Sequence, residues 1–250
     1  MSRAGLLTAF RSPPDNPLVS VSAGKPTPRS AVFRRSLQRD FPAATRGEGV
    51  YLWDEQGNRY LDFSGSAAVN FIGHGVTEIS AAMAEQARKL EFVHTSQFTT
   101  PVAEEYAREL IEFAGDGFRG GAVYFTSGGS EAVETALKLA RQYQVEAGRR
   151  KRWQILSRDQ SYHGSTLGAL AVSGNKRRRE MYLPMVRELP HIGFPYCYRC
   201  AYRAEYPACE LACVEEIEQH FTRHADPRSL AAVIVEPVLG EGGFVVPPPG

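Results

Sequence analysis

One stretch in the middle of the chain constrains its fold most: residues 122–143, which read AVYFTSGGSEAVETALKLARQY. Residues 122–126 are apolar and rich in β-formers, so we expect a buried strand there. A tight turn follows at residues 127–130. From Glu131 onward, apolar residues recur at helical spacing, which predicts a helix. A strand that runs through a turn into a helix indicates an α/β fold.

The turn between this strand and helix has the features of a phosphate site. Backbone N–H groups at a helix start lack intrahelical acceptors, and the helix dipole favours an anion there. Gly128 and Gly129 let an anion approach the backbone closely, and Ser130 adds a hydroxyl donor. The spacing matches neither a dinucleotide-binding G-x-G-x-x-G nor a Walker A loop. An ordinary strand-to-helix turn capped by Ser130 is the alternative, and the pattern alone leaves both open.

Residues 125–141, FTSGGSEAVETALKLAR, resemble the phosphate-binding turn of the class III pyridoxal-phosphate-dependent aminotransferases. The Gly-Ser-Glu-Ala-x-Glu pattern of that family is matched by residues 129–134. The resemblance runs from about Gly47 to the end of the chain and includes Gly73 and His74, a family landmark. It departs from the family at Val76 and Thr77, where a Pro is usual. It implies a doubly wound, mainly parallel sheet of the type I pyridoxal-phosphate enzymes.

The same resemblance predicts the domain organisation. Residues 1–46 are expected to be a leader and the entry to a small domain, with a short amphipathic segment near residues 32–41. Residues 47–72 are a small-domain hairpin. Residues 73–250 are a cofactor-binding large domain that is incomplete at its C-terminal end. Helical periodicity predicts helices at residues 78–90 and 101–113. We expect a strand at residues 153–157, and the apolar run at residues 230–238 predicts another.

Three further residues are candidates for the cofactor site. Tyr162 follows a predicted strand at the sheet edge where open α/β sheets bind ligands, and the resemblance places its ring on the cofactor ring. His163 is either a hydrogen-bonding residue at a helix start or a cofactor contact. Glu236 ends the apolar run LAAVIVEPV, where a carboxylate is costly to bury without a partner. In the family, the matching Glu lies near the cofactor and pairs with an Arg that otherwise receives a substrate carboxylate.

The function implied by the resemblance is transamination. An amino group moves from an amine or amino acid to a 2-oxo acid through pyridoxal 5'-phosphate. The family's Asp-Glu-Val motif and the Lys that binds the cofactor covalently have no counterpart, because Lys138 and Lys176 lie in the wrong contexts. We therefore expect no catalytic residue in this chain and an inactive fragment. The alternatives are an aminomutase or decarboxylase on the same fold, and a non-catalytic binding module that carries zinc.

Four cysteines lie close together in the sequence: Cys197, Cys200, Cys209 and Cys213. Their spacing is C-x2-C, then eight residues, then C-x3-C, and four thiolates so arranged can hold a tetrahedral zinc ion. The alternatives are four reduced thiols in a loop or a disulfide between nearby residues. The sequence does not decide between these possibilities, so we assign no metal ligand from it.

Composition excludes several classes of protein. Hydrophobic residues make up 43% of the chain and the formal net charge is +1, so neither disorder nor a polyanionic partner such as nucleic acid is indicated. No apolar stretch approaches the ~20 residues that span a bilayer, and the N-terminus lacks the apolar core of a signal peptide. We expect a cytoplasmic protein without a membrane partner and, by resemblance, a homodimer when full length.

Overall fold

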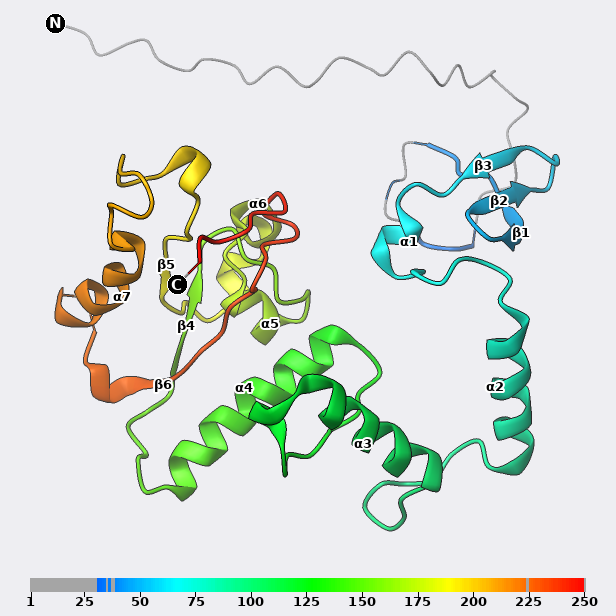
Figure 1. Cartoon of the computed structure of the whole chain (residues 1–250), viewed down its shortest axis with the longest axis horizontal. Coiled ribbons are helices and arrows are strands. Elements are labelled where there is room, and N and C mark those ends of the chain that lie inside the picture. The colour runs from blue at the N-terminus through cyan, green and yellow to red at the C-terminus, as the bar shows by residue number, and fades with distance from the viewer. Residues whose placement is uncertain (1–30, 35, 37–38, 224, 250) are drawn as a thin grey trace, which may run out of the picture. The chain divides into compact units, whose positions relative to one another are not determined.

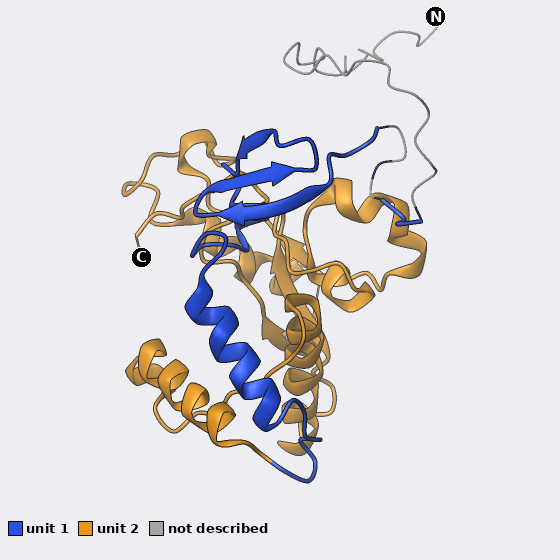
Figure 2. Ribbon diagram, turned by 90° about the vertical axis from the view of Figure 1, so that its right-hand side faces the viewer, with its two compact units in different colours: residues 1–98 blue, residues 99–250 orange. Residues whose placement is uncertain are grey.

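The computed structural model describes residues 31–34, 36, 39–223 and 225–249. The chain divides into two compact units, residues 1–98 and residues 99–250 (Figure 2). Most of the predicted leader lies outside the described residues. Within the short amphipathic segment expected near residues 32–41, the described residues form neither helix nor strand.

The first unit is built on a three-stranded antiparallel sheet with the order β1-β2-β3 (Figure 1). The strands are β1 (Ala44–Glu48), β2 (Tyr51–Asp54) and β3 (Arg59–Leu61). The pairing of β2 with β3 confirms the predicted hairpin. Strand β1 pairs with β2 as well, although the sequence had placed most of it in the leader.

The loop between β2 and β3 is closed by the carboxylate of Asp54. It accepts hydrogen bonds from the backbone N–H of Gln56 at 3.0 Å and of Asn58 at 2.9 Å, and from the hydroxyl of Tyr60 at 2.7 Å. The side chains of Asn58 and Tyr60 are the largest causes that lower the pKa of Asp54, because they stabilise the ionised form. The turn residues that predicted this hairpin therefore also fix its loop.

The segment after β3 returns to the sheet through a single left-handed turn, α1 (Gly65–Ala68), and then enters α2 (Thr77–Lys89). Gly73, between α1 and α2, lies against Gly49, which is in the turn between β1 and β2. The backbone of Gly49 exchanges two hydrogen bonds with His74, at 2.9 and 2.8 Å. Gly73 has a φ of +83°, and a Cβ placed on it would lie 2.9 Å from the carbonyl oxygen of Gly49. This position therefore needs glycine for two separate reasons.

The second unit is an α/β layer around a short parallel sheet with the order β5-β4-β6 (Figure 1). Strand β4 leads through two helices to β5 on one side, and β5 leads through a third helix to β6 on the other side. The elements are α3 (Pro101–Ala114), α4 (Gly129–Glu146), β4 (Gln154–Arg158), α5 (Leu167–Val172), α6 (Lys176–Arg179), β5 (His191–Ile192), α7 (Ala212–Arg223) and β6 (Leu230–Val233). Short 3₁₀ helices occur at Asp116–Phe118, Glu180–Met185, Cys197–Arg199 and Pro227–Ser229.

The core of this unit forms where β4 meets α5. Ile155, Leu156 and residues 169–172 are buried, and Leu156 and Val172 have no exposed surface. Burying a side chain of this size contributes about 1.5–3 kcal/mol. Strand β4 is paired on both sides, and its central residues Ile155, Leu156 and Ser157 are all buried.

Several sequence predictions hold to within two residues. The helices expected at 78–90 and 101–113 are α2 and α3, and the helix expected from Glu131 is α4, which begins at Gly129. The strand expected at 153–157 is β4. The parallel sheet agrees with the predicted fold class.

One strand prediction was wrong and another was right only in part. Residues 122–126 form no strand among the described residues, and the side chains of Tyr124 and Phe125 are 76% and 47% exposed. The run at 230–238 forms the parallel strand β6 over Leu230–Val233, and the backbone N–H of Ile234 still donates to the carbonyl of Leu156 at 2.9 Å, but the residues that follow form no strand. An apolar sequence supplies the tendency to form a strand, but a strand also needs a neighbouring backbone to complete its hydrogen bonds.

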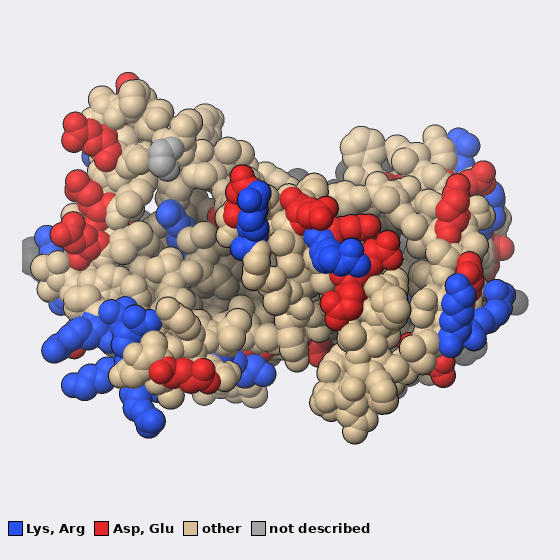
Figure 3. Space-filling view, turned by 60° about the horizontal axis from the view of Figure 1, so that its bottom comes forward, with Lys and Arg blue, Asp and Glu red and all other residues tan. Residues whose placement is uncertain are grey.

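The surface carries charges of both signs. On the face drawn in Figure 3, acidic and basic side chains lie among one another, and one group of basic side chains stands out. Within the described residues, no helix combines the length and apolarity that a bilayer crossing requires.

We predict that Gly73→Ala destabilises the first unit more than Gly57→Ala does. Both positions have a left-handed φ, +83° and +81°, so each Ala costs about 1–2 kcal/mol in backbone strain. A Cβ at Gly57 meets nothing within 4 Å, whereas one at Gly73 strikes the backbone of Gly49 and costs about 1–3 kcal/mol more.

Urea unfolding followed by the fluorescence of Trp53, in a Trp153→Phe background, measures both losses. Equal losses at the two positions would contradict the close approach of the two segments.

Candidate functional site

The start of α4 is an open, glycine-lined turn. Gly128 precedes the helix, and both it and Gly129 are exposed, with no atom within 4 Å of a Cβ placed on either. Within the described part of the chain, the backbone N–H groups of Gly129, Ser130 and Glu131 meet no acceptor. Unpaired N–H groups, a helix dipole and free space in front of them form an anion site. The geometry thus suits the phosphate predicted here.

Ser130 joins this turn to the loop that follows β4. Its Oγ accepts a hydrogen bond from the backbone N–H of Ser165 at 3.0 Å, and as a hydroxyl it keeps a proton to donate. A Cβ on Gly164 would lie 2.7 Å from that Oγ and 2.8 Å from the Cβ of Ala169. Gly164 also has a φ of +137°. The loop therefore approaches the helix start as closely as a glycine permits.

Glu134, one helical turn after Ser130, caps the neighbouring helix α5. Its Oε1 accepts hydrogen bonds from the backbone N–H groups of Gly168 at 2.8 Å and Ala169 at 3.2 Å. These are first-turn groups of α5, whose own N-cap residue, Thr166, makes no capping hydrogen bond. A carboxylate from α4 therefore replaces the cap that α5 lacks. A side chain at Gly168 would collide with this carboxylate.

Glu236 holds the other end of the same loop. Its Oε2 accepts a hydrogen bond from the backbone N–H of Tyr162 at 2.7 Å, and its Oε1 accepts one from Gly240 at 3.2 Å. Tyr162 follows β4 and Glu236 follows β6, so the two residues meet at the carboxyl ends of adjacent parallel strands. The chain order reverses between these strands, and open α/β sheets bind ligands at such points. None of the ion pairs among the described residues includes Glu236.

The ring of Tyr162 is half-buried beside this edge. The guanidinium of Arg178 lies 5.1 Å from its centroid, and Arg178 is itself held by both carboxylate oxygens of Glu241, at 3.0 and 2.7 Å. Because the ring is half-buried, part of its surface remains accessible to a planar ligand. The position is compatible with the stacking role predicted for Tyr162.

The side chain of His163 points into the sheet edge. Its Nε2 lies 3.3 Å from Ser157 Oγ, and its backbone N–H donates to Ser173 Oγ at 2.8 Å. Burial is the largest effect on its imidazole and lowers the pKa of His163, against the charge of Glu236, which raises it. The ring is therefore neutral near pH 7. Because α5 begins four residues later, at Leu167, His163 does not start a helix.

A family model described as aminotransferase class III matches residues 34–250 of this chain. The chain belongs to the class III aminotransferases. A curated relative, an uncharacterized aminotransferase named YodT from Bacillus subtilis, is 35% identical over 223 residues, which cover 88% of this chain and 49% of the relative.

The chain is also similar to solved structures of transaminases. An (S)-enantioselective omega-transaminase from Thermomicrobium roseum matches with a TM-score of 0.76 and 37% identity, over 84% of this chain and 46% of its own. A PLP-bound amine transaminase from an uncultivated Pseudomonas species matches with a TM-score of 0.77 and 30% identity. The match covers 91% of this chain and 51% of the Pseudomonas chain. The chain therefore has the type I fold of pyridoxal-phosphate-dependent transaminases and spans about half the length of these relatives.

Lys138 and Lys176 are the two lysines that the sequence places in the wrong contexts for a covalent link to the cofactor. Lys138 lies within α4 and Lys176 is the first residue of α6, and both are exposed. Neither is part of the hydrogen-bonded loop at residues 162–169.

Sequence reasoning assigned no role to Glu134, although it quoted the motif that contains it. A usable signal was present: Ser130 and Glu134 are four residues apart and so share one face of α4. Two polar side chains on one face of a helix start indicate that this face meets backbone donors and not an apolar layer.

We predict that Glu134→Ala lowers the stability of the second unit by about 1–3 kcal/mol, because it leaves the N–H groups of Gly168 and Ala169 without an acceptor. Glu131→Ala is the matched control. Glu131 is exposed in the first turn of the same helix, so its loss costs about 0.3–1 kcal/mol through the helix dipole alone.

The measurement is urea unfolding monitored by Trp153 in a Trp53→Phe background. Glu134→Gln, which keeps an acceptor oxygen, should lose less than Glu134→Ala. If Glu131→Ala and Glu134→Ala lose the same stability, the carboxylate does not cap α5.

Proposed function

We propose that this chain supplies the phosphate-binding part of a transaminase, which moves an amino group from an amine or amino acid to a 2-oxo acid through pyridoxal 5'-phosphate. The observation that carries the proposal is the open start of α4, with unpaired N–H groups at Gly129 and Ser130 and free space in front of them. When bound, the cofactor acts as the electron sink for the substrate carbanion.

Each site residue has a separate task in this proposal. Gly128 and Gly129 admit the phosphate to the backbone, and Ser130 donates its hydroxyl proton to a phosphate oxygen. The ring of Tyr162 stacks on the pyridine ring. His163 is a neutral imidazole that shapes the base of the site, consistent with its burial and its contact with Ser157.

Glu236 acts in the proposal by fixing the backbone of the cofactor loop. Both of its carboxylate oxygens already accept backbone N–H groups, from Tyr162 and Gly240. If an Arg of the working enzyme binds the Glu236 carboxylate, it shares the carboxylate oxygens with these two backbone N–H groups. Glu236 therefore positions Tyr162 whether or not such an Arg is present.

We further propose the domain boundaries predicted from the sequence: an entry segment at 1–46, a hairpin at 47–72 and a cofactor domain at 73–250. The proton-transferring Lys lies outside the chain, so the 250 residues alone are inactive. When the isolated chain is mixed with pyridoxal 5'-phosphate and treated with borohydride, no cofactor should become covalently attached to it. Stoichiometric attachment of the cofactor would refute the absence of the Lys.

We also propose that the whole protein is a cytoplasmic homodimer.

We predict that Ser130→Asp, in the product of the complete reading frame, weakens pyridoxal-phosphate binding by at least about tenfold. The added carboxylate lies where the phosphate binds, and like charges in contact cost more than the 1.4 kcal/mol that corresponds to a factor of ten. The measurement is a titration of the apoenzyme followed by cofactor absorbance.

Ser80→Asp is the control, because Ser80 is exposed on α2 in the other unit. Unchanged cofactor affinity in Ser130→Asp would disprove the phosphate role of the turn. An amino-donor screen on the same protein then separates transamination from decarboxylation or amino-group migration, since only transamination consumes a 2-oxo acid.

A further inference from the structure

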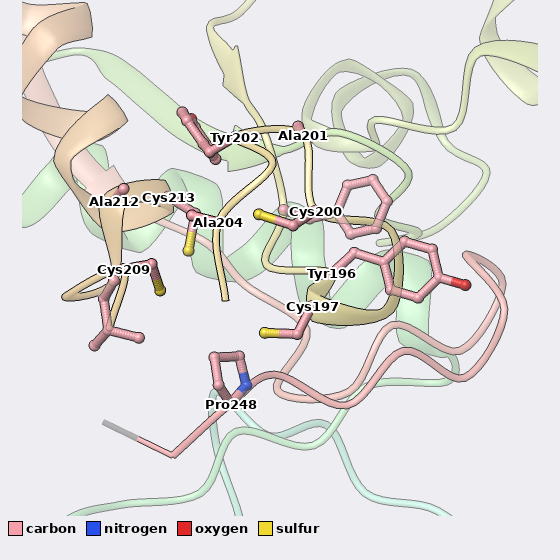
Figure 4. Close-up of a pocket in the computed structure, with 12 residues that line it drawn as sticks. Tyr196, Cys197, Cys200, Ala201, Tyr202, Ala204, Cys209, Ala212, Cys213 and Pro248 are labelled. Carbon is pink, nitrogen blue, oxygen red and sulfur yellow. The ribbon is translucent and has the colours of Figure 1, made fainter. Parts of the chain in front are cut away.

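The four cysteines surround one cavity in the second unit. Figure 4 shows their sulfur atoms turned toward a common space, Cys197 and Cys200 from one side and Cys209 and Cys213 from the other. All four are free thiols. The cavity measures about 20 Å³, enough for an occupant no larger than a water molecule. The fold therefore brings together two cysteine pairs that are separated by eight residues of loop.

The donor set is typical of a structural zinc site. Cys197 and Cys200 have the C-x2-C spacing, and Cys209 and Cys213 have C-x3-C, both within the range seen for zinc ligands. Four sulfur donors with no carboxylate or imidazole among them favour a soft or borderline metal over magnesium or calcium. Cys213 lies in the first turn of α7, and the other three lie on irregular backbone or 3₁₀ turns.

The cavity is lined mainly by apolar and aromatic side chains besides the cysteines. Apolar side chains, among them Phe194, Leu211 and Pro248, line it together with the cysteines, of which Cys197 is exposed and the other three are half-buried. The described residues that line the cavity include no carboxylate that would repel four thiolates.

One wall of the cavity is already fixed. The hydroxyl of Tyr202 donates to Glu216 Oε2 at 2.7 Å, and the same oxygen accepts the backbone N–H of Gly193 at 3.0 Å. Glu216 belongs to α7, so the loop that carries Cys200 is tied to the helix that carries Cys213. This link limits how far the two halves of the cluster can separate.

The sulfur atoms are not yet at bonding distance from a common centre. Across the part of the chain that the structure describes, no group of three or more His, Cys, Asp or Glu residues is arranged to hold a metal ion. Zinc–sulfur bonds are ~2.3 Å long, so binding requires the thiols to move inward. Side-chain rotation and adjustment of the loop at residues 197–211 supply this movement, because no strand pairing holds that loop.

We propose that Cys197, Cys200, Cys209 and Cys213 bind one zinc ion, which joins the loop at residues 197–211 to the start of α7. The role is structural, since four protein ligands leave no open coordination position for a substrate. The zinc site is independent of the phosphate turn at α4, so either proposal stands if the other fails.

The test is the zinc content of the chain purified under reducing conditions from zinc-supplemented medium. We expect about one zinc per chain, as for a four-cysteine site. Replacement of any one cysteine by serine, with Cys213→Ser as the first, should remove most of it. Tyr198→Phe is the matched control, because Tyr198 lies between two of the ligands but is 80% exposed, and it should keep the metal.

Cobalt substitution keeps the test informative if a serine variant does not fold. Metal-free wild-type chain that takes up Co²⁺ should show thiolate-to-cobalt charge transfer and the visible bands of a tetrahedral site. Two results would overturn the proposal: wild-type chain with a zinc content near zero and no cobalt spectrum, or cysteines that resist alkylation until they are reduced, because they form disulfides.

Discussion

The second unit depends on side-chain oxygens that accept backbone N–H groups from one loop. Ser130 and Glu134 come from the start of α4, and Glu236 comes from the end of β6. The donors are Tyr162 and Ser165 in the connection between β4 and α5, and Gly168 and Ala169 in the first turn of α5. A loop of this kind cannot satisfy its own N–H groups, and leaving them buried and unpaired costs about 1–3 kcal/mol each. Remote acceptors therefore decide where the loop lies.

This arrangement explains how a ligand site forms from distant parts of the sequence. The acceptors bring the loop after β4 against the helix start, while the glycines of the turn leave the space in front of α4 open. Among the described residues no acceptor meets the first N–H groups of α4, which leaves them for an anion. The same interactions that stabilise the loop thus place an aromatic ring, an imidazole and an anion site along one edge of the sheet.

Much of the fold was predictable from local pattern. The helices α2, α3 and α4, the hairpin of β2 and β3, and strand β4 follow from periodicity and turn chemistry, because each is specified by its own residues. The family was predictable from residues 125–141. The strands expected at 122–126 and beyond Val233 were not realised, since strand formation depends on partners that periodicity does not reveal.

The candidate site was only partly predictable. Its glycines and Ser130 follow from the turn, and Tyr162 and Glu236 follow from the resemblance. The capping role of Glu134 was not predicted, because its carboxylate accepts a hydrogen bond from Gly168, which lies 34 positions away in the sequence. The convergence of the four cysteines also needs the loop geometry, although their spacing signalled the possibility. Long-range hydrogen bonds and loop closure are tertiary properties that a single sequence does not specify locally.

The account rests on the open start of α4 as an anion site, and amide NMR tests this most directly. The ¹⁵N-labelled chain is titrated with pyridoxal 5'-phosphate and, separately, with pyridoxal, which lacks the phosphate. The account predicts that the amide resonances of Gly129, Ser130 and Glu131 shift with the phosphorylated compound and stay in place with the other. Shifts of equal size with both compounds, or none with either, would contradict it.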